Sequence, residues 1–217
     1  MRSLLIIFLS IALLSSIASA ELLTTAKPLG QGKWGVLGSG LQDSNTLNTS
    51  GYSLASLGGY VGYGLSEKLD LFVTVGSANV GGLPAGSISM TAYGATLKYT
   101  VLEEGEALPV SVAVGGGYKA TTNKMTGLAD ASGSQIGAAV GISKLIVPFI
   151  PYGGLTYRRT AASGSVTQTQ IDLTVGTAIA WSLQGAVFVE YTLQSITPNG
   201  GTAYSSPQIG AGVGYAL

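Results

Sequence analysis

The chain has 217 residues, of which only 9% are charged, and its ten basic and ten acidic side chains cancel. This balance argues against nucleic-acid binding, which would select a basic face, and the charged fraction is far below the roughly 25–35% of a typical soluble surface. Cysteine and histidine are absent. Neither disulfides nor Cys/His metal sites can therefore form, and we expect no cofactor.

The first twenty residues have the organisation of a secretory signal peptide. Arg2 precedes an apolar run from Leu4 to Leu14, and a small-x-small sequence follows that ends at Ala20. An N-terminal membrane anchor is the alternative, but the apolar run is short for a membrane-spanning helix. We expect residues 1–20 to be removed and an exported mature chain to begin at Glu21.

From residue 32 onward, apolar residues alternate with small or polar ones, which predicts β-strands with one apolar face. The alternation is clear over residues 55–65, 69–75, 91–101, 109–119, 135–143, 171–181, 186–193 and 208–217. Segments 33–42 and 149–159 are less clear, because the first could face either way and Pro151 interrupts the second. Counting both predicts ten strands, long enough for the roughly 9–11 residues of a tilted membrane-spanning strand. Eight strands is the alternative.

The connections between these segments alternate in length. They are short near 66–68, 102–108, 146–148 and 183–185, and longer near 43–50, 80–88, 121–133, 161–167 and 196–205. Short turns at one end and longer loops at the other are typical of an outer-membrane β-barrel. At one short turn, matching the outward residues predicts that Trp181 pairs with Val187. Gly185 would then take the left-handed position of a three-residue loop.

A soluble β-sandwich also alternates, but its polar face meets water and carries Lys and Glu. Here that face is mostly Gly, Ala, Ser and Thr, which favours a confined interior. Phe72 is expected opposite Gly62, where its ring would cover the bare backbone. Aromatic residues also gather at strand ends, as in the two girdles of a membrane barrel: Tyr63, Tyr99, Trp181 and Tyr215 near the short turns, and Tyr52, Tyr118 and Tyr157 near the longer loops.

The last strand ends in "GAGVGYAL". It resembles the C-terminal insertion signal of bacterial outer-membrane barrels, with Gly212, Tyr215 and Leu217 at the signal's positions and Leu217 where phenylalanine is usual. The resemblance covers roughly residues 32–217. It implies an all-β, single antiparallel up-and-down transmembrane barrel, located in the bacterial outer membrane and delivered to the barrel-assembly machinery through its last strand. Residues 21–31 would be a periplasmic lead-in or, as the alternative, a peptide folded into the lumen.

The same resemblance argues against enzymatic activity. Known outer-membrane barrel enzymes, such as omptin proteases, lipid A deacylases, palmitoyltransferases and phospholipases, rely on a histidine that this chain lacks. A carboxylate pair could act as acid and base, but Asp172 and Glu190 should project several residues apart on neighbouring strands. We therefore expect a protein that is not an enzyme.

The larger side chains on the inward parity are the candidate lumen-lining residues: Tyr60, Phe72, Lys98, Lys119, Asp172, Phe188 and Glu190. The many small residues between them would leave unfilled volume, which favours a narrow porin-like passive pore in which Glu190 prefers cations. The alternatives are a closed structural or surface-interaction barrel without transport, and a carrier of small apolar compounds. On the outward parity, Arg159 is a candidate contact for lipopolysaccharide phosphate, with an ordinary rim charge as the alternative. Outer-membrane lipid and lipopolysaccharide are thus the expected partners.

Overall fold

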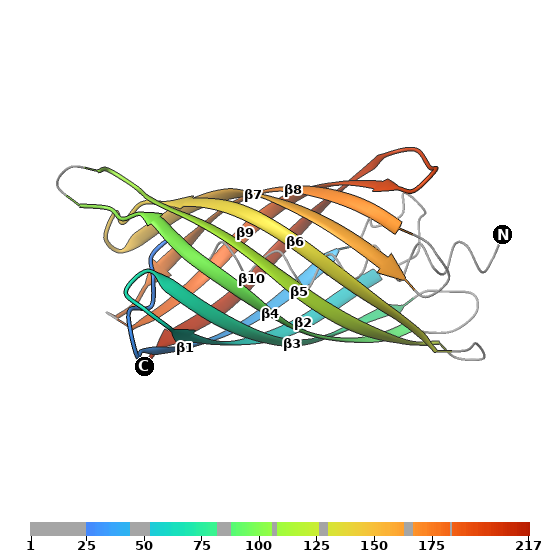
Figure 1. The fold of residues 1–217 in the computed structure, drawn as a ribbon, viewed down its shortest axis with the longest axis horizontal. Coiled ribbons are helices and arrows are strands. Elements are labelled where there is room, and N and C mark those ends of the chain that lie inside the picture. Colours follow the sequence, from blue (N-terminus) through green and yellow to red (C-terminus); the bar gives the residue numbers. More distant parts are fainter. Residues whose placement is uncertain are drawn as a thin grey trace.

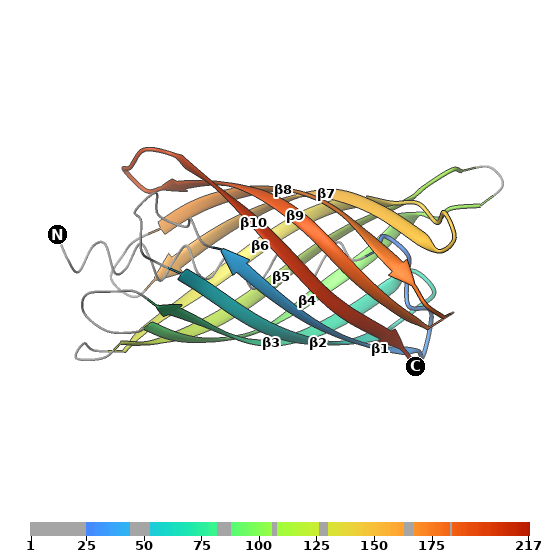
Figure 2. The same cartoon turned by 180° about the vertical axis from the view of Figure 1, so that it is seen from behind.

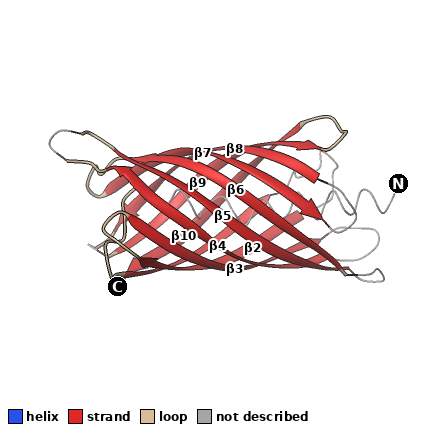
Figure 3. Ribbon diagram, viewed as in Figure 1, coloured by secondary structure: helices blue, strands red, loops and turns tan. Residues whose placement is uncertain are grey.

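The computed structural model describes residues 25–43, 53–81, 88–105, 108–125, 130–162, 167–182 and 184–217. The predicted signal peptide and Tyr52 lie outside these residues. The described part of the chain forms ten β-strands and no helix long and apolar enough to span a membrane (Figure 3). The strands are β1 (Trp34–Asp43), β2 (Ser53–Gly64), β3 (Leu69–Gly81), β4 (Ile88–Leu102), β5 (Ser111–Met125), β6 (Ala131–Ser143), β7 (Phe149–Ala162), β8 (Thr167–Ala180), β9 (Gly185–Pro198) and β10 (Tyr204–Ala216).

The strands close into a barrel. Each strand is antiparallel to its neighbours in the sequence, and β1 closes the sheet against β10 (Figure 2). The closing register runs from Gly35 opposite Ala216 to Gln42 opposite Ile209. Closure leaves no sheet edge unpaired, which a β-structure inside a lipid bilayer requires. The prediction of a ten-stranded up-and-down barrel is therefore confirmed, and the eight-stranded alternative is wrong.

The two faces of the wall differ as the alternation predicts. In β8, Leu173 and Val175 are each 53% exposed, whereas Asp172 and Thr174 between them are at most 1% exposed. The ambiguous first strand has the same arrangement, with Trp34 and Val36 exposed and Leu37 half-buried on the inner face. The apolar residues thus form the outer surface, and the small and polar residues face the interior.

The two ends of the barrel differ in their connections. The C-terminus lies at the end formed by the short turns, and the connection between β9 and β10 lies at the other end (Figure 1). Trp34 adds to the aromatic residues at the short-turn end, where its ring lies 4.6 Å from that of Tyr63. Tyr99, Trp181 and Tyr215 are also exposed there.

The predicted register at one short turn is wrong. Ile179, rather than Trp181, pairs with Val187, and Trp181 donates its backbone N–H to Gly185 O at 3.0 Å. The side chain of Ser182 accepts the N–H of Gly185 at 2.9 Å. The left-handed conformation predicted for Gly185 is also wrong, because its φ is not positive. Glycine occupies position 185 because the Trp181 ring lies against it: a Cβ there would overlap the indole. The physical reason is close packing, which the strand alternation alone does not show.

A second glycine has the partner expected for it. Gly62 and Phe72 are direct cross-strand partners in β2 and β3. A Cβ on Gly62 would lie 2.5 Å from the Phe72 ring, so the ring covers the glycine backbone as predicted.

Candidate lumen and short-turn mouth

The seven candidate lumen residues all project from the inner face of the wall. Phe72 is half-buried, and the other six are at most 5% exposed. They come from β2, β3, β4, β5, β8 and β9, so the inner face carries aromatic and charged groups around most of its circumference.

Two ion pairs join strands that are neighbours in the wall. Lys98 Nζ lies 3.1 Å from Asp70 Oδ2, and the two residues are direct partners in β3 and β4. Arg158 of β7 pairs with Asp172 of β8, and Gln170 Nε2 donates to the other Asp172 oxygen at 2.6 Å. Buried charges are stable only when paired and hydrogen-bonded. Because these partners are neighbours in the sheet, their bonds run along the wall.

Some uncharged inward side chains also form hydrogen bonds between neighbouring strands. The hydroxyls of Thr174 and Thr192, direct partners in β8 and β9, lie 2.9 Å apart. Gln194 Nε2 donates to Gln208 Oε1 at 2.9 Å between β9 and β10. The inner face therefore includes polar side chains that bond laterally between neighbouring strands.

Glu190 has a different kind of partner. The Tyr152 hydroxyl donates to Glu190 Oε2 at 3.1 Å, over the intervening β8. Tyr152 also packs with Phe188 and Ala178 in a small apolar cluster, against which Leu37 lies. A carboxylate next to this cluster, bonded to a neutral hydroxyl, places negative charge on the inner wall beside the aromatic rings.

Three inward residues were missed by the sequence analysis: Asp70, Tyr152 and Arg158. Pro151 obscured the alternation in β7, which contains Tyr152 and Arg158. The signal was present, because the outward Leu155 and Tyr157 require even-numbered residues of β7 to face inward. Asp70 was on the inward parity but was not singled out, since its ion pair with Lys98 depends on the register between β3 and β4.

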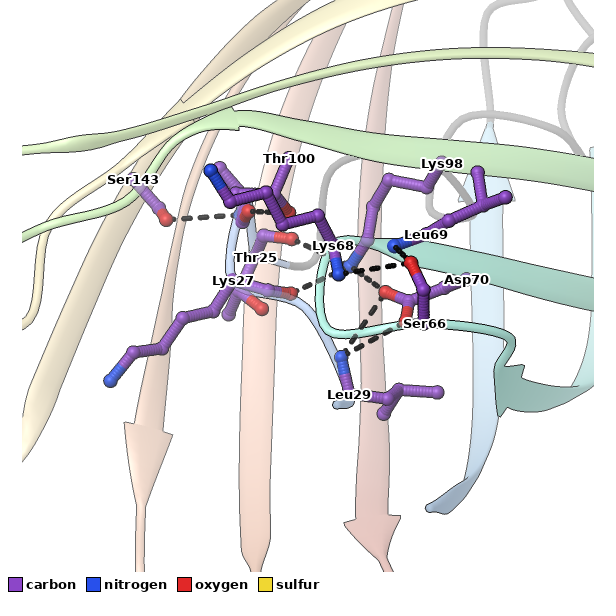
Figure 4. Close-up of polar contacts among 11 residues, drawn as sticks. Thr25, Lys27, Leu29, Ser66, Lys68, Leu69, Asp70, Lys98, Thr100 and Ser143 are labelled. Atoms are coloured by element: carbon purple, nitrogen blue, oxygen red, sulfur yellow. Dashed lines mark hydrogen bonds and ion pairs between the residues drawn. The ribbon is translucent and has the colours of Figure 1, made fainter. Parts of the chain in front are cut away.

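Residues 25–32, which we call the strap, lie in the short-turn mouth (Figure 4). Lys98 Nζ donates to Thr25 O at 3.3 Å and to Lys27 O at 2.7 Å. With Asp70, these two carbonyls give all three N–H donors of the buried ammonium an acceptor. Asp70 in turn accepts the backbone N–H of Leu29, at 3.1 and 3.2 Å from its two oxygens.

Both the backbone N–H and the backbone carbonyl of Ala26 form hydrogen bonds with side chains of the wall. Its N–H donates to Ser143 Oγ at 3.0 Å, and its carbonyl accepts from Thr100 Oγ1 at 2.9 Å. Ala26 itself is 3% exposed. The sequence favoured a periplasmic lead-in for residues 21–31, but the described part of this segment contacts inward side chains of β3, β4 and β6. Inward polar groups of the wall therefore satisfy backbone groups of the strap.

Two glycines allow the chain to turn between the strap and the start of β1. Gly30 and Gly32 have φ angles of 89° and 76°, a left-handed conformation that other residues rarely adopt. Gly32 N–H donates to Gly64 O at 2.9 Å, and a Cβ on Gly64 would overlap Gly30 O. The strap therefore depends on the absence of a side chain at Gly64, the last residue of β2.

A cavity of about 600 Å³ lies beside the strap and is lined by residues of the strap, β1–β4 and β7–β10. Its apolar lining includes Leu29 of the strap with Leu37, Phe72, Ile150 and Phe188, and three alanines, Ala178, Ala180 and Ala186, leave space along the wall. Lys27 and Lys33 also line it. The strap thus occupies part of the mouth and leaves a cavity next to it.

The residues of the C-terminal signal lie where the barrel closes. Tyr215 and Leu217 face outward and are 40% and 65% exposed. Gly212 faces inward, and a Cβ there would overlap both the Phe188 ring and Gly38 O. Its identity therefore has a packing reason in addition to the resemblance.

The two carboxylates considered for catalysis are separated along the wall. Asp172 is opposite Gln194, whereas Glu190 is opposite Gly176, four positions further along β8. Asp172 is bonded to Arg158 and Gln170, and Glu190 to Tyr152. The two groups thus have different partners at different levels of the interior.

Comparison with solved structures finds several chains that this chain resembles. The β domain of the Bordetella autotransporter Brka matches with a TM-score of 0.50 and 13% identity, over 87% of this chain and 100% of that one. The outer-membrane protease OmpT from Escherichia coli matches with a TM-score of 0.45 and 12% sequence identity, over 86% of this chain and 94% of that one. The N-terminal β-barrel domain of Pseudomonas aeruginosa OprF matches with a TM-score of 0.38 and 12% sequence identity, over 87% of this chain and 99% of that one.

No protein-family model matches the sequence, and comparison with characterised proteins finds no significant match. The structural likeness to the Brka domain therefore defines the class at the level of the fold. With its closed antiparallel topology and apolar outer face, this chain is a ten-stranded barrel of the outer-membrane type.

Proposed function

We propose that this protein is a non-enzymatic, narrow passive pore of the bacterial outer membrane, with its short-turn mouth in the periplasm. The observation that carries this proposal is the lateral bonding of the inward ion pairs. Asp70 with Lys98, and Arg158 with Asp172, are held along the wall rather than across the interior. Ten strands also enclose more space than the eight whose inward side chains just fill a barrel.

The strap accounts for the narrowness in this proposal. It is fixed to one side of the mouth by Lys98, Asp70, Thr100 and Ser143. The cavity of about 600 Å³ beside it supplies the route. Small hydrated solutes would pass there, next to Phe188 and Glu190.

A closed barrel without transport is the second candidate. The burial of Gln170, Asp172 and Gln194, each at most 1% exposed, favours it. Such a barrel would act through its outer surface or as a structural element of the membrane.

Planar-bilayer conductance separates these two functions. Refolded mature protein, residues 21–217, should give small stepwise conductances, and a variant that begins at residue 30 should give larger ones because the strap no longer occupies the mouth. Gly59→Ala is the control, because a Cβ there meets nothing within 4 Å. Altered gel mobility without boiling confirms folding of each variant. If neither the mature protein nor the variant that begins at residue 30 conducts ions, the barrel is closed.

A further inference from the structure

Three polar side chains form a row across the outer face of the barrel near its long-loop end. Arg159 in β7 is the direct partner of Thr169 in β8, and Thr169 is the direct partner of Thr197 in β9. Arg159 and Thr197 are exposed, and Thr169 is half-buried. Direct partners on one face of a sheet have Cβ atoms about 4.5–5.5 Å apart. One guanidinium and two hydroxyls therefore gather on a single patch of the outer surface.

The turn after β9 encloses this row on one side. Gly201 N–H donates to Pro198 O at 3.1 Å, which closes a β-turn over residues 198–201. The turn, the polar row and Tyr157 line a pocket of about 440 Å³. None of the described residues that line it carries a carboxylate, so Arg159 gives the pocket a positive charge.

The outer surface below the pocket is mainly apolar. Two residues back along β7, the row contains Tyr157 and Ile171, with Ser195 of β9 as its one polar member, and the next row contains Leu155, Leu173 and Leu193. The five apolar residues are all exposed. A polar, cationic pocket above an aromatic and then an aliphatic surface matches the order of headgroup and acyl chains in one leaflet of a membrane.

We propose that this pocket binds a phosphate of lipid A, the membrane anchor of lipopolysaccharide, in the outer leaflet. Arg159 would donate two parallel N–H bonds to the phosphate oxygens, the bidentate geometry that a guanidinium provides. The hydroxyls of Thr169 and Thr197 would donate to the remaining oxygens, and the acyl chains would lie against Tyr157 and Ile171. This inference rests on the proposed outer-membrane placement, in which the long-loop end faces outward.

The test is a titration of refolded mature protein in detergent with bisphosphorylated lipid A, with the dissociation constant as the readout. Arg159→Gln should weaken binding about 10- to 100-fold, because a hydrogen bond to a charged group contributes about 1.5–3 kcal/mol. Arg159→Lys should recover only part of this loss, because an ammonium cannot form the bidentate pair. Fully dephosphorylated lipid A should bind the original chain as weakly as it binds the Arg159→Gln variant.

Lys124→Gln is the matched control. Lys124 is also exposed near the long-loop end, but it belongs to β5 and does not line the pocket. An equal loss of affinity in both variants would mean general charge attraction and would overturn the site, as would unchanged affinity in Arg159→Gln. Thr197→Val tests the same pocket with a smaller structural change. Conductance in bilayers without lipopolysaccharide should be the same with and without Arg159→Gln, so failure of this site and failure of the pore are distinguishable.

Discussion

Gly212 shows how one position can carry both a packing requirement and a recognition pattern. A Cβ there would overlap the Phe188 ring and the backbone oxygen of Gly38. Gly212→Ala should therefore lower the free energy of unfolding by about 1–3 kcal/mol, the usual cost of overpacking. Urea denaturation in detergent or lipid vesicles measures this change.

The control is Gly59→Ala, which should leave stability nearly unchanged because a Cβ at position 59 meets nothing within 4 Å. Adding Phe188→Leu to Gly212→Ala should recover part of the loss by removing the ring that causes the overlap. If Gly212→Ala unfolds like the original chain but inserts poorly into membranes, the glycine serves recognition by the assembly machinery rather than packing.

At the scale of the strand, the apolar outer face predicts sensitivity to charge that depends on depth. Val175 lies midway along β8 and is 53% exposed. Val175→Arg should cost about 2–4 kcal/mol of unfolding free energy in lipid vesicles, as expected near the bilayer midplane. Thr122→Arg, on the same face of β5 but near its long-loop end, should cost about 0–1 kcal/mol. Equal costs at the two positions would contradict membrane embedding of this face.

The strap is the element whose attachment can be measured most directly, because the chain has no native cysteine. Ala26→Cys places a single thiol at a position that is 3% exposed, so it should react slowly with a polar maleimide. Adding Lys98→Met should accelerate labelling at least several-fold, since it removes the ammonium that bonds Thr25 O and Lys27 O. Adding Lys144→Met, at an exposed turn position, is the control. Rapid labelling of Ala26→Cys alone would show that the strap does not stay in the mouth.

The strands were predictable from the sequence and the strap was not, for one physical reason. A strand between lipid and lumen must alternate, so its pattern is visible even where Pro151 interrupts it. The strap instead satisfies its backbone with side chains that are 41 to 117 residues away in the sequence. No periodic signal marks such contacts. The turn at Gly185 was mispredicted for a similar reason, because the packing of the Trp181 ring against the glycine changed the register.

At the scale of the whole barrel, the charges on the inner face determine which ions a pore would prefer. Among strand residues whose side chains the structure describes, the inward charges are Asp70, Lys98, Lys119, Arg158, Asp172 and Glu190. Two ion pairs cancel four of these charges. Glu190 is hydrogen-bonded to the neutral Tyr152 hydroxyl. It lies two residues along the inner face of β9 from Phe188, which lines the mouth cavity, so in the proposed pore its charge would act on ions that pass that cavity.

Glu190→Gln should therefore reduce cation preference without preventing assembly, because glutamine can still accept the Tyr152 hydrogen bond. A unit charge about 5 Å from an ion in water contributes about 0.8 kcal/mol, which corresponds to roughly a fourfold change in local cation concentration at low salt. The measurement is the reversal potential across a KCl gradient, which should shift toward the equilibrium potential of chloride. If Glu190→Gln conducts with an unchanged reversal potential, the permeating ions do not pass Glu190, and the route through the mouth cavity is wrong.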